Sequence, residues 1–273
     1  MSSARCGICP RQCVIPENGT GFCGVRENQS GQAVYAAYGK VSAIALDPIE
    51  KKPLYMFRPG SKILSVGGFG CNLRCPFCQN SAISMEYDMA AAQTATPAQI
   101  AGLALKTVPD GNIGVAYTYN EPLIGYEFVF DCAKLIHGAG LANVLVTNGT
   151  VNPAPLEALL PYIDAMNIDL KAFSDAFYKK LGGSLETVKD VISLSRRHCH
   201  VEITTLVIPC ENDGDIEPMA RWLASLDPDI PLHLSRFFPR HKYSDREPTP
   251  RETVYRLAET AGKHLNRVFC GNI

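Results

Sequence analysis

The chain has 273 residues, 46% of them hydrophobic, which is enough to form one large domain with a small appendage. Its formal net charge of −1 excludes the basic excess typical of nucleic-acid-binding proteins. It has no apolar run of 18 residues, and no apolar segment follows the N-terminal residues. We therefore expect no membrane span, no secretory signal, and neither nucleic acid nor membrane as a partner.

Cysteine is abundant, with eleven residues. In a chain without a secretory signal, this abundance favours metal or redox chemistry over disulfide bonds. We therefore expect a protein of the reducing cytoplasm. Two groups of cysteines are distinguished by their spacing, one within the first 23 residues and one between residues 71 and 78.

Residues 1–60 are rich in glycine and cysteine and are predicted to form a small head. The segments 33–38 and 41–46 alternate in polarity, as short strands of that head would. Four cysteines, interleaved with glycine and proline, could form a metal cage: Cys6, Cys9, Cys13 and Cys23. A bound metal would supply folding energy that so few apolar residues cannot. Their spacing does not select the metal, so zinc, a second iron–sulfur cluster and metal-free thiols all stay open.

From residue 61 to residue 273, predicted strands alternate with predicted helices, the pattern of βα units and a parallel sheet. Strands are expected at 63–67, 114–118, 143–147, 165–169, 200–207 and 231–236. Helices are expected at 97–106, 125–137, 153–160, 185–197, 216–225 and 250–264. The predicted fold class is α/β, a partial (β/α)6 barrel of TIM type, because a full eight-unit barrel usually needs a longer chain.

Cys71, Cys75 and Cys78 have the spacing C-x3-C-x2-C, directly after an apolar segment. Three thiolates this close can hold three irons of a cubane cluster and leave the fourth iron open for chemistry. A zinc site would need a fourth ligand, but the next residues are Gln79 and Asn80. A loop at the C-terminal end of a first strand also lies where an α/β barrel keeps its catalytic groups.

This loop is the signature of the radical S-adenosylmethionine (radical SAM) enzymes, and the chain resembles that family. The segments 47–54, 117–122 and 169–171 resemble the pyruvate formate-lyase activating-enzyme type. The closest resemblance is to the AmmeMemoRadiSam-system radical SAM enzymes. The resemblance implies a [4Fe-4S] cluster on the three cysteines, which reductively cleaves SAM to a 5′-deoxyadenosyl radical that abstracts a hydrogen atom from a substrate. It also implies a flavodoxin- or ferredoxin-type reductant.

Polar residues at the predicted strand ends have the chemical types that the methionine zwitterion and the ribose of SAM require. These residues are Asn120, Glu121, Thr147, Asp169 and Lys171. The resemblance implies that the backbone at Phe77 contacts the adenine and that Tyr119, Asn120 and Glu121 occupy the position of the methionine-amine motif. It also implies that Asp169 and Lys171 contact SAM.

Simpler structural roles are alternatives for several of these residues. Asp169 and Lys171 could form a plain salt bridge, and Glu121 could be a helix-start acid. We interpret Lys51 and Lys52 as part of a solvated turn.

The sequence does not identify the substrate. An activating enzyme would abstract hydrogen from a glycine of a partner protein, whereas an orphan radical SAM enzyme could modify another protein or a small molecule. A hypothesis of another class is a non-catalytic iron–sulfur or zinc scaffold, which should show broken ligands. SAM cleavage by the reduced protein would separate the enzyme from the scaffold.

Overall fold

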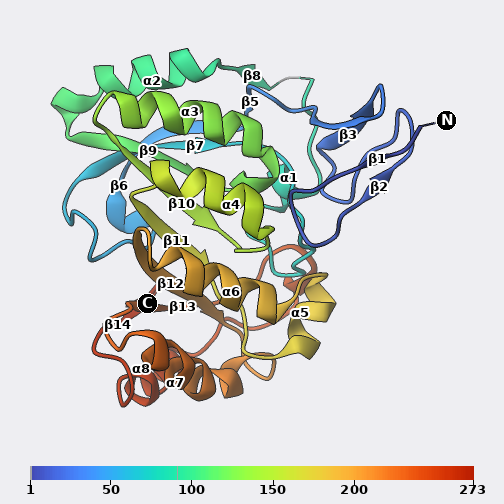
Figure 1. The fold of residues 1–273 in the computed structure, drawn as a ribbon. Coiled ribbons are helices and arrows are strands. Elements are labelled where there is room, and N and C mark those ends of the chain that lie inside the picture. The colour runs from blue at the N-terminus through green and yellow to red at the C-terminus, as the bar shows by residue number, and fades with distance from the viewer. Residues whose placement is uncertain (1, 91) are drawn as a thin grey trace.

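The computed structural model of the protein describes residues 2–90 and 92–273. Within these residues, eight strands form one sheet in the order β14-β13-β12-β11-β10-β9-β7-β6 (Figure 1). The strands are β6 (Ala43–Pro48), β7 (Lys62–Gly67), β9 (Asn112–Thr118), β10 (Ala142–Thr147), β11 (Ala165–Asp169), β12 (His200–Val207), β13 (Leu232–Arg236) and β14 (Val268–Gly271). Neighbouring strands are parallel except β6 and β7. The predicted α/β class with a partial barrel is confirmed.

A helix follows each strand from β7 to β13 and covers the outer face of the sheet (Figure 1). These helices are α2 (Pro97–Lys106), α3 (Tyr126–Gly138), α4 (Pro153–Leu159), α6 (Leu185–Ser195), α7 (Ile216–Leu226) and α8 (Arg251–Ala261). The start of α2 shows how local sequence sets these boundaries: the Thr96 side chain accepts from the Gln99 amide, and Gln99 accepts from the Thr96 amide. None of the helices in the described residues is long and apolar enough to cross a membrane.

The remaining helices are short. They are α1 (Ser81–Ser84), α5 (Asp175–Leu181), η1 (Ile49–Lys51), η2 (Val108–Asp110), η3 (Pro122–Gly125), η4 (Leu160–Tyr162), η5 (Asp213–Asp215) and η6 (His241–Tyr243). The sequence did not predict α5. Its start is defined by Ser174, whose hydroxyl accepts from the Phe177 amide at 3.4 Å.

Two edge strands change the predicted sheet. Strand β6, which we expected in the head, pairs antiparallel with β7 and belongs to the sheet, with Ala43 opposite Gly67. Strand β14 was not predicted and extends the sheet beyond β13. Alternating polarity indicates a strand but not its partner, so the pattern of residues 41–46 could not place β6.

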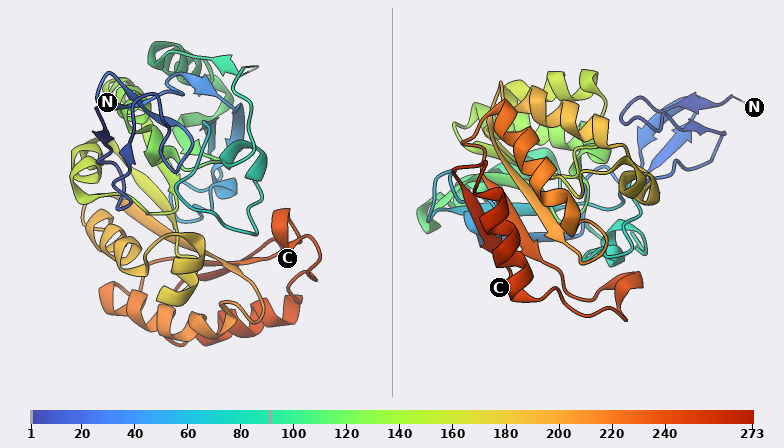
Figure 2. Two further views of the ribbon diagram at one scale, coloured as in Figure 1. Left: turned by 90° about the vertical axis from the view of Figure 1, so that its right-hand side faces the viewer. Right: turned by 90° about the horizontal axis from the view of Figure 1, so that it is seen from below.

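The head consists of two small hairpins and stands at one end of the barrel, away from α8 (Figure 2). Its strands are β1 (Ala4–Arg5), β2 (Val14–Ile15), β3 (Arg26–Gln29) and β4 (Gln32–Tyr35), and a further pair joins β5 (Lys40–Val41) to β8 (Gln93–Thr94). Arg26 forms an ion pair of 2.7 Å with Glu127 of α3. The Arg11 guanidinium donates to the Gly182 carbonyl at 2.6 Å. These contacts dock the head on the barrel.

Candidate functional site

A cavity of about 750 Å³ lies at the C-terminal ends of the barrel strands and extends to the loop after β6. All ten residues predicted to bind the cluster or SAM line it: Cys71, Cys75, Phe77, Cys78, Tyr119, Asn120, Glu121, Thr147, Asp169 and Lys171. They come from the loop after β7 and from the ends of β9, β10 and β11, which parallel strands bring to one edge of a sheet. The structure therefore gathers the whole predicted set into one site.

The three cysteines lie on residues 71–78, which we call the cluster loop. Cys75 is buried, whereas Cys71 and Cys78 are half-buried. The side-chain nitrogen Nδ2 of Asn148 lies 3.6 Å from the Cys71 sulfur. Phe77 is 5% exposed and stacks on Phe177 with ring centroids 6.1 Å apart, which shields the buried side of the loop. The loop is thus held in place by packing, with its three thiols on the cavity.

Burial favours the neutral form of two of these thiols. Burial raises the pKa of Cys75 to about 11, although nearby Lys171 acts in the opposite direction. Burial also raises the pKa of Cys71, and the adjacent Glu121 carboxylate adds to the effect. Because a metal binds thiolates, cluster assembly would release these protons. Three thiols beside a lysine form a donor set that fits an anionic iron–sulfur cluster.

Asp169 and Lys171 form an ion pair at the end of β11, with Nζ and Oδ2 2.8 Å apart. Burial opposes charge on Lys171, but the Asp169 carboxylate and nearby Cys75 outweigh it and raise the lysine pKa. The plain salt bridge considered above is therefore present. The pair also lines the cavity, where each partner can meet the opposite charge of a zwitterionic ligand.

Glu121 is 3% exposed and joins the ends of two strands. It accepts hydrogen bonds from the amides of Leu123 at 3.0 Å and Asn148 at 2.7 Å, and from the Thr147 hydroxyl at 2.7 Å. Burial raises its pKa to about 7, although these bonds favour the charged form. The bond from Leu123 is the helix-start role considered above. A carboxylate accepts about four bonds, so one more donor can be accommodated.

Asn120 holds the backbone ahead of the cluster loop. Its side chain accepts from the Gly68 amide at 2.9 Å and donates to the carbonyls of Phe69 and Gly70 at 3.1 Å each. Tyr119 beside it has a φ of +72°, a conformation that strains a residue with a Cβ atom. Both residues shape the cavity wall, and their contact with SAM stays a prediction.

The interpretation of Lys52 as solvated is wrong. Lys52 is 3% exposed, and its ammonium lies 2.9 Å from the Asp47 carboxylate. Asp47 also accepts from the hydroxyls of Ser65 and Tyr119. Burial opposes ionisation, but Lys52 and the two hydroxyls hold the pKa of Asp47 well below its usual range. Only Lys51 of the pair lies in solvent. The sequence did not indicate the burial of Lys52, because the local charge pattern does not show that Asp47 of β6 lies against it.

A second buried carboxylate lies in β12. Glu202 accepts from the amides of Tyr55 at 3.0 Å and Met56 at 2.8 Å, and contacts His200 at 2.9 Å and His233 at 2.6 Å. Burial opposes ionisation, but these four bonds lower the pKa of Glu202 to about 2. The network ties the loop after β6 to the barrel.

Two further polar residues line the cavity without having been assigned a role from the sequence. His233 is 3% exposed, and the buried Thr204 hydroxyl has no hydrogen-bond partner among the described residues. They face the cavity from neighbouring strands, paired in register. Inward-facing polar positions on β12 and β13 could have identified both residues.

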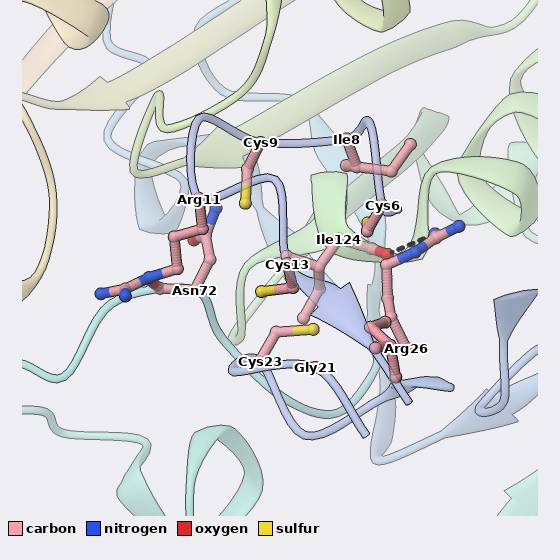
Figure 3. A pocket seen from close by; sticks show the side chains of 11 residues that line it. Cys6, Ile8, Cys9, Arg11, Cys13, Gly21, Cys23, Arg26, Asn72 and Ile124 are labelled. Carbon is pink, nitrogen blue, oxygen red and sulfur yellow. Dashed lines mark hydrogen bonds between the residues drawn. The ribbon is translucent and has the colours of Figure 1, made fainter. Parts of the chain in front are cut away.

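The four head cysteines surround a second, smaller cavity (Figure 3). Cys6, Cys9 and Cys23 are buried, and Cys13 is half-buried. We call these four residues the head cage. Across residues 2–90 and 92–273, no three His, Cys, Asp or Glu side chains come close enough to hold one metal ion.

The sequence profile of the Radical SAM superfamily matches residues 65–223, which include the cluster loop and Asp169 with Lys171. This match covers more than half of the chain. The chain belongs to the Radical SAM superfamily. Membership implies an enzyme that cleaves SAM at an iron–sulfur cluster, with a [4Fe-4S] cluster and SAM as its cofactors.

This radical SAM protein is 39% identical over 279 residues to an uncharacterized protein of Methanocaldococcus jannaschii, covering 100% of this chain and 82% of the relative. It is 26% identical over 220 residues to a protein of the same organism provisionally named a glycyl-radical enzyme activating enzyme, covering 75% and 87% of the two chains. Streptococcus suis SuiB bound to S-adenosylmethionine aligns with a TM-score of 0.56 at 12% identity, over 74% of this chain and 47% of that one. The likeness to SuiB shows the fold alone.

Proposed function

We propose that Cys71, Cys75 and Cys78 hold the [4Fe-4S] cluster and that SAM binds beside it in the same cavity. The observation that carries the proposal is that one cavity collects the three thiols together with both charged groups of β11. When bound, the cluster would supply one electron to the sulfonium of SAM, which would leave methionine and a 5′-deoxyadenosyl radical able to abstract a hydrogen atom from the substrate.

The residues around the cluster loop have separate roles in this proposal. Lys171 attracts the methionine carboxylate, and Asp169 attracts the ammonium. Glu121 offers its remaining acceptor to the ammonium, and the Thr147 hydroxyl orients Glu121. The backbone at Phe77 contacts the adenine. Tyr119 and Asn120 hold the wall against which SAM lies.

For the substrate, we propose a glycine of a partner protein, as in activating enzymes of the pyruvate formate-lyase type. The relative provisionally named a glycyl-radical enzyme activating enzyme supports this class. The resemblance to the AmmeMemoRadiSam-system enzymes favours a second candidate, the modification of another protein or a small molecule. In either case, a flavodoxin- or ferredoxin-type protein of the cytoplasm would supply the electron.

A non-catalytic scaffold is the remaining alternative, and the geometry disfavours it. A scaffold does not need Asp169 and Lys171 beside its ligands, yet both lie on the cavity with the three cysteines. We also propose that the head cage holds a metal, either zinc or a second iron–sulfur cluster.

The decisive experiment is anaerobic reconstitution, reduction with dithionite and assay of 5′-deoxyadenosine after addition of SAM. We expect the product from the wild-type protein and none from Cys75→Ala. Cys210→Ala is the matched control, because Cys210 is exposed and lies outside both cysteine groups. Intact SAM after incubation with the cluster-loaded, reduced wild-type protein would support the scaffold.

A further inference from the structure

The head cage and the reaction cavity are separate but adjacent. Among the described residues, the two cavities share no lining residue. A group bound in the cage would therefore lie outside the cavity proposed for SAM.

Both neighbours of Cys71 contact the head cage. A Cβ atom on Gly70 would lie 2.6 Å from the carbonyl oxygen of Cys23, so these two backbones are in contact. On the other side, Asn72 lines the cage next to Cys9 (Figure 3). The cage thus abuts the cluster loop at the first of its three cysteines.

A hydrogen-bonded path supplements this contact. Asn148 donates to the Asn72 side chain at 3.0 Å, and the same Asn148 nitrogen lies 3.6 Å from the Cys71 sulfur. Asn72 therefore faces the cage, while Asn148 faces the sulfur of Cys71. Two side chains, Asn72 and Asn148, connect the cage to the first cysteine of the cluster loop.

A buried cation without a full set of partners points to an anion in the cage. Arg26 lines the cage and is 4% exposed. Its two terminal nitrogens donate to Glu127 and to the carbonyls of Ile124 and Ala33. Its Nε is buried and has no hydrogen-bond partner among the described residues. A buried N–H without an acceptor is rare, and a metal-bound thiolate or a sulfide would supply one.

The arrangement of the ligand residues bears on the choice of metal. Four thiolates on one zinc ion each lie about 2.3 Å from it and crowd together. Here no three described ligand residues lie together as one ion would require, although the four cysteines line one cavity. The cysteines of the cluster loop, predicted to hold three separate irons, are also too far apart for one ion. This shared arrangement favours a polynuclear cluster over one zinc ion in the cage.

We propose that Cys6, Cys9, Cys13 and Cys23 hold a second iron–sulfur cluster that passes electrons to the cluster on Cys71, Cys75 and Cys78. A flavodoxin- or ferredoxin-class donor loses one electron, and the head cluster gains it. The head cluster then loses the same electron to the cluster that faces SAM. The relay rests on the function proposed above, but the presence of the head cluster does not.

The first test measures the metal bound by the head cage alone. The variant Cys71→Ala/Cys75→Ala/Cys78→Ala is reconstituted anaerobically, and iron, sulfide and zinc are measured. We expect about half of the wild-type iron, matching sulfide, and an electron paramagnetic resonance signal after reduction. One zinc without iron, or no metal, overturns the head cluster. This result does not depend on SAM cleavage, so failure of the proposed function is recognised separately.

The second test concerns the relay. In the fully reduced wild-type protein, the two paramagnetic clusters should broaden each other's signals, and the triple variant should lack this broadening. The ratio of SAM cleavage with reduced flavodoxin to cleavage with dithionite should fall at least tenfold in Cys13→Ala and stay unchanged in Cys210→Ala. A wild-type spectrum equal to the sum of the separate clusters overturns the relay, as does an unchanged ratio in Cys13→Ala.

Discussion

The Glu202 carboxylate and the His233 imidazole lie 2.6 Å apart on neighbouring strands inside the barrel. The same carboxylate accepts two amides of the loop after β6. A single charge therefore fixes both an imidazole on the cavity and the loop that closes one side of it. Removing that charge should loosen both.

We expect Glu202→Gln to lower the free energy of unfolding of the metal-free protein by about 2 kcal/mol, because hydrogen bonds to a buried charge are lost. Urea denaturation measures this value. Glu157→Gln is the control, since Glu157 is exposed on α4, and it should leave the free energy unchanged. Equal stability of the two variants would contradict a structural role for the Glu202 charge.

Acid should abolish the difference in free energy of unfolding between the wild type and Glu202→Gln. The pKa of Glu202 is lowered to about 2 in the folded protein, from an ordinary value of 4.5. Its stabilisation is therefore complete above pH 4.5 and is lost as the pH falls towards 2. The free-energy difference between the two proteins should shrink across this window. A difference that stays constant would show that the charge is not its source.

The raised pKa of Glu121 predicts the opposite pH dependence of stability. Burial raises its pKa to about 7, from 4.5, so the folded protein holds a proton that the unfolded chain releases. Stability should therefore fall as the pH rises from 4.5 to 7, by up to about 3 kcal/mol. Glu121→Gln removes the titrating group and should flatten this part of the curve. Parallel curves for the variant and the wild type would refute the prediction.

The Asp169–Lys171 pair should determine SAM affinity. Loss of one charged contact in Lys171→Met should raise the Kd for SAM roughly 10- to 100-fold. Equilibrium binding to the oxidised, cluster-loaded protein measures the effect without turnover. Lys180→Met is the matched control, because Lys180 is exposed and lies outside the cavity. Equal affinities for the two variants would leave the pair as a structural salt bridge only.

Asn120 should control how tightly the cluster loop retains its metal. Asn120→Ala removes the hydrogen bonds that fix the backbone from Gly68 to Gly70. We expect iron to be lost to a chelator roughly tenfold faster than in the wild type. Asn266→Ala, at an exposed position, should behave like the wild type. Unchanged iron loss in Asn120→Ala would show that the cysteines alone hold the loop.

The sequence predicted the alternating core of the barrel because short apolar segments alternate with helical segments along the chain. It could not place β6, whose alternating pattern fits a head hairpin as well as a sheet edge. The cavity residues were predictable from strand ends, since parallel strands deliver those ends to one edge.

Burial was harder to predict than position. Lys52 looked solvated because its partner Asp47 comes from β6, which the sequence had placed in the head. The hydrogen bonds of the Asn120 side chain to the backbone of Gly68, Phe69 and Gly70 were likewise not indicated by the sequence. Such partners depend on tertiary packing and leave no trace in local spacing.

The head cage is lined by residues from both the head and the barrel. Ile124 and Asn72, both contributed by the barrel, complete the lining around thiols that are buried or half-buried. The cluster proposed for the cage would therefore be enclosed partly by the head and partly by the barrel. Loading of that cluster and docking of the head would then depend on each other.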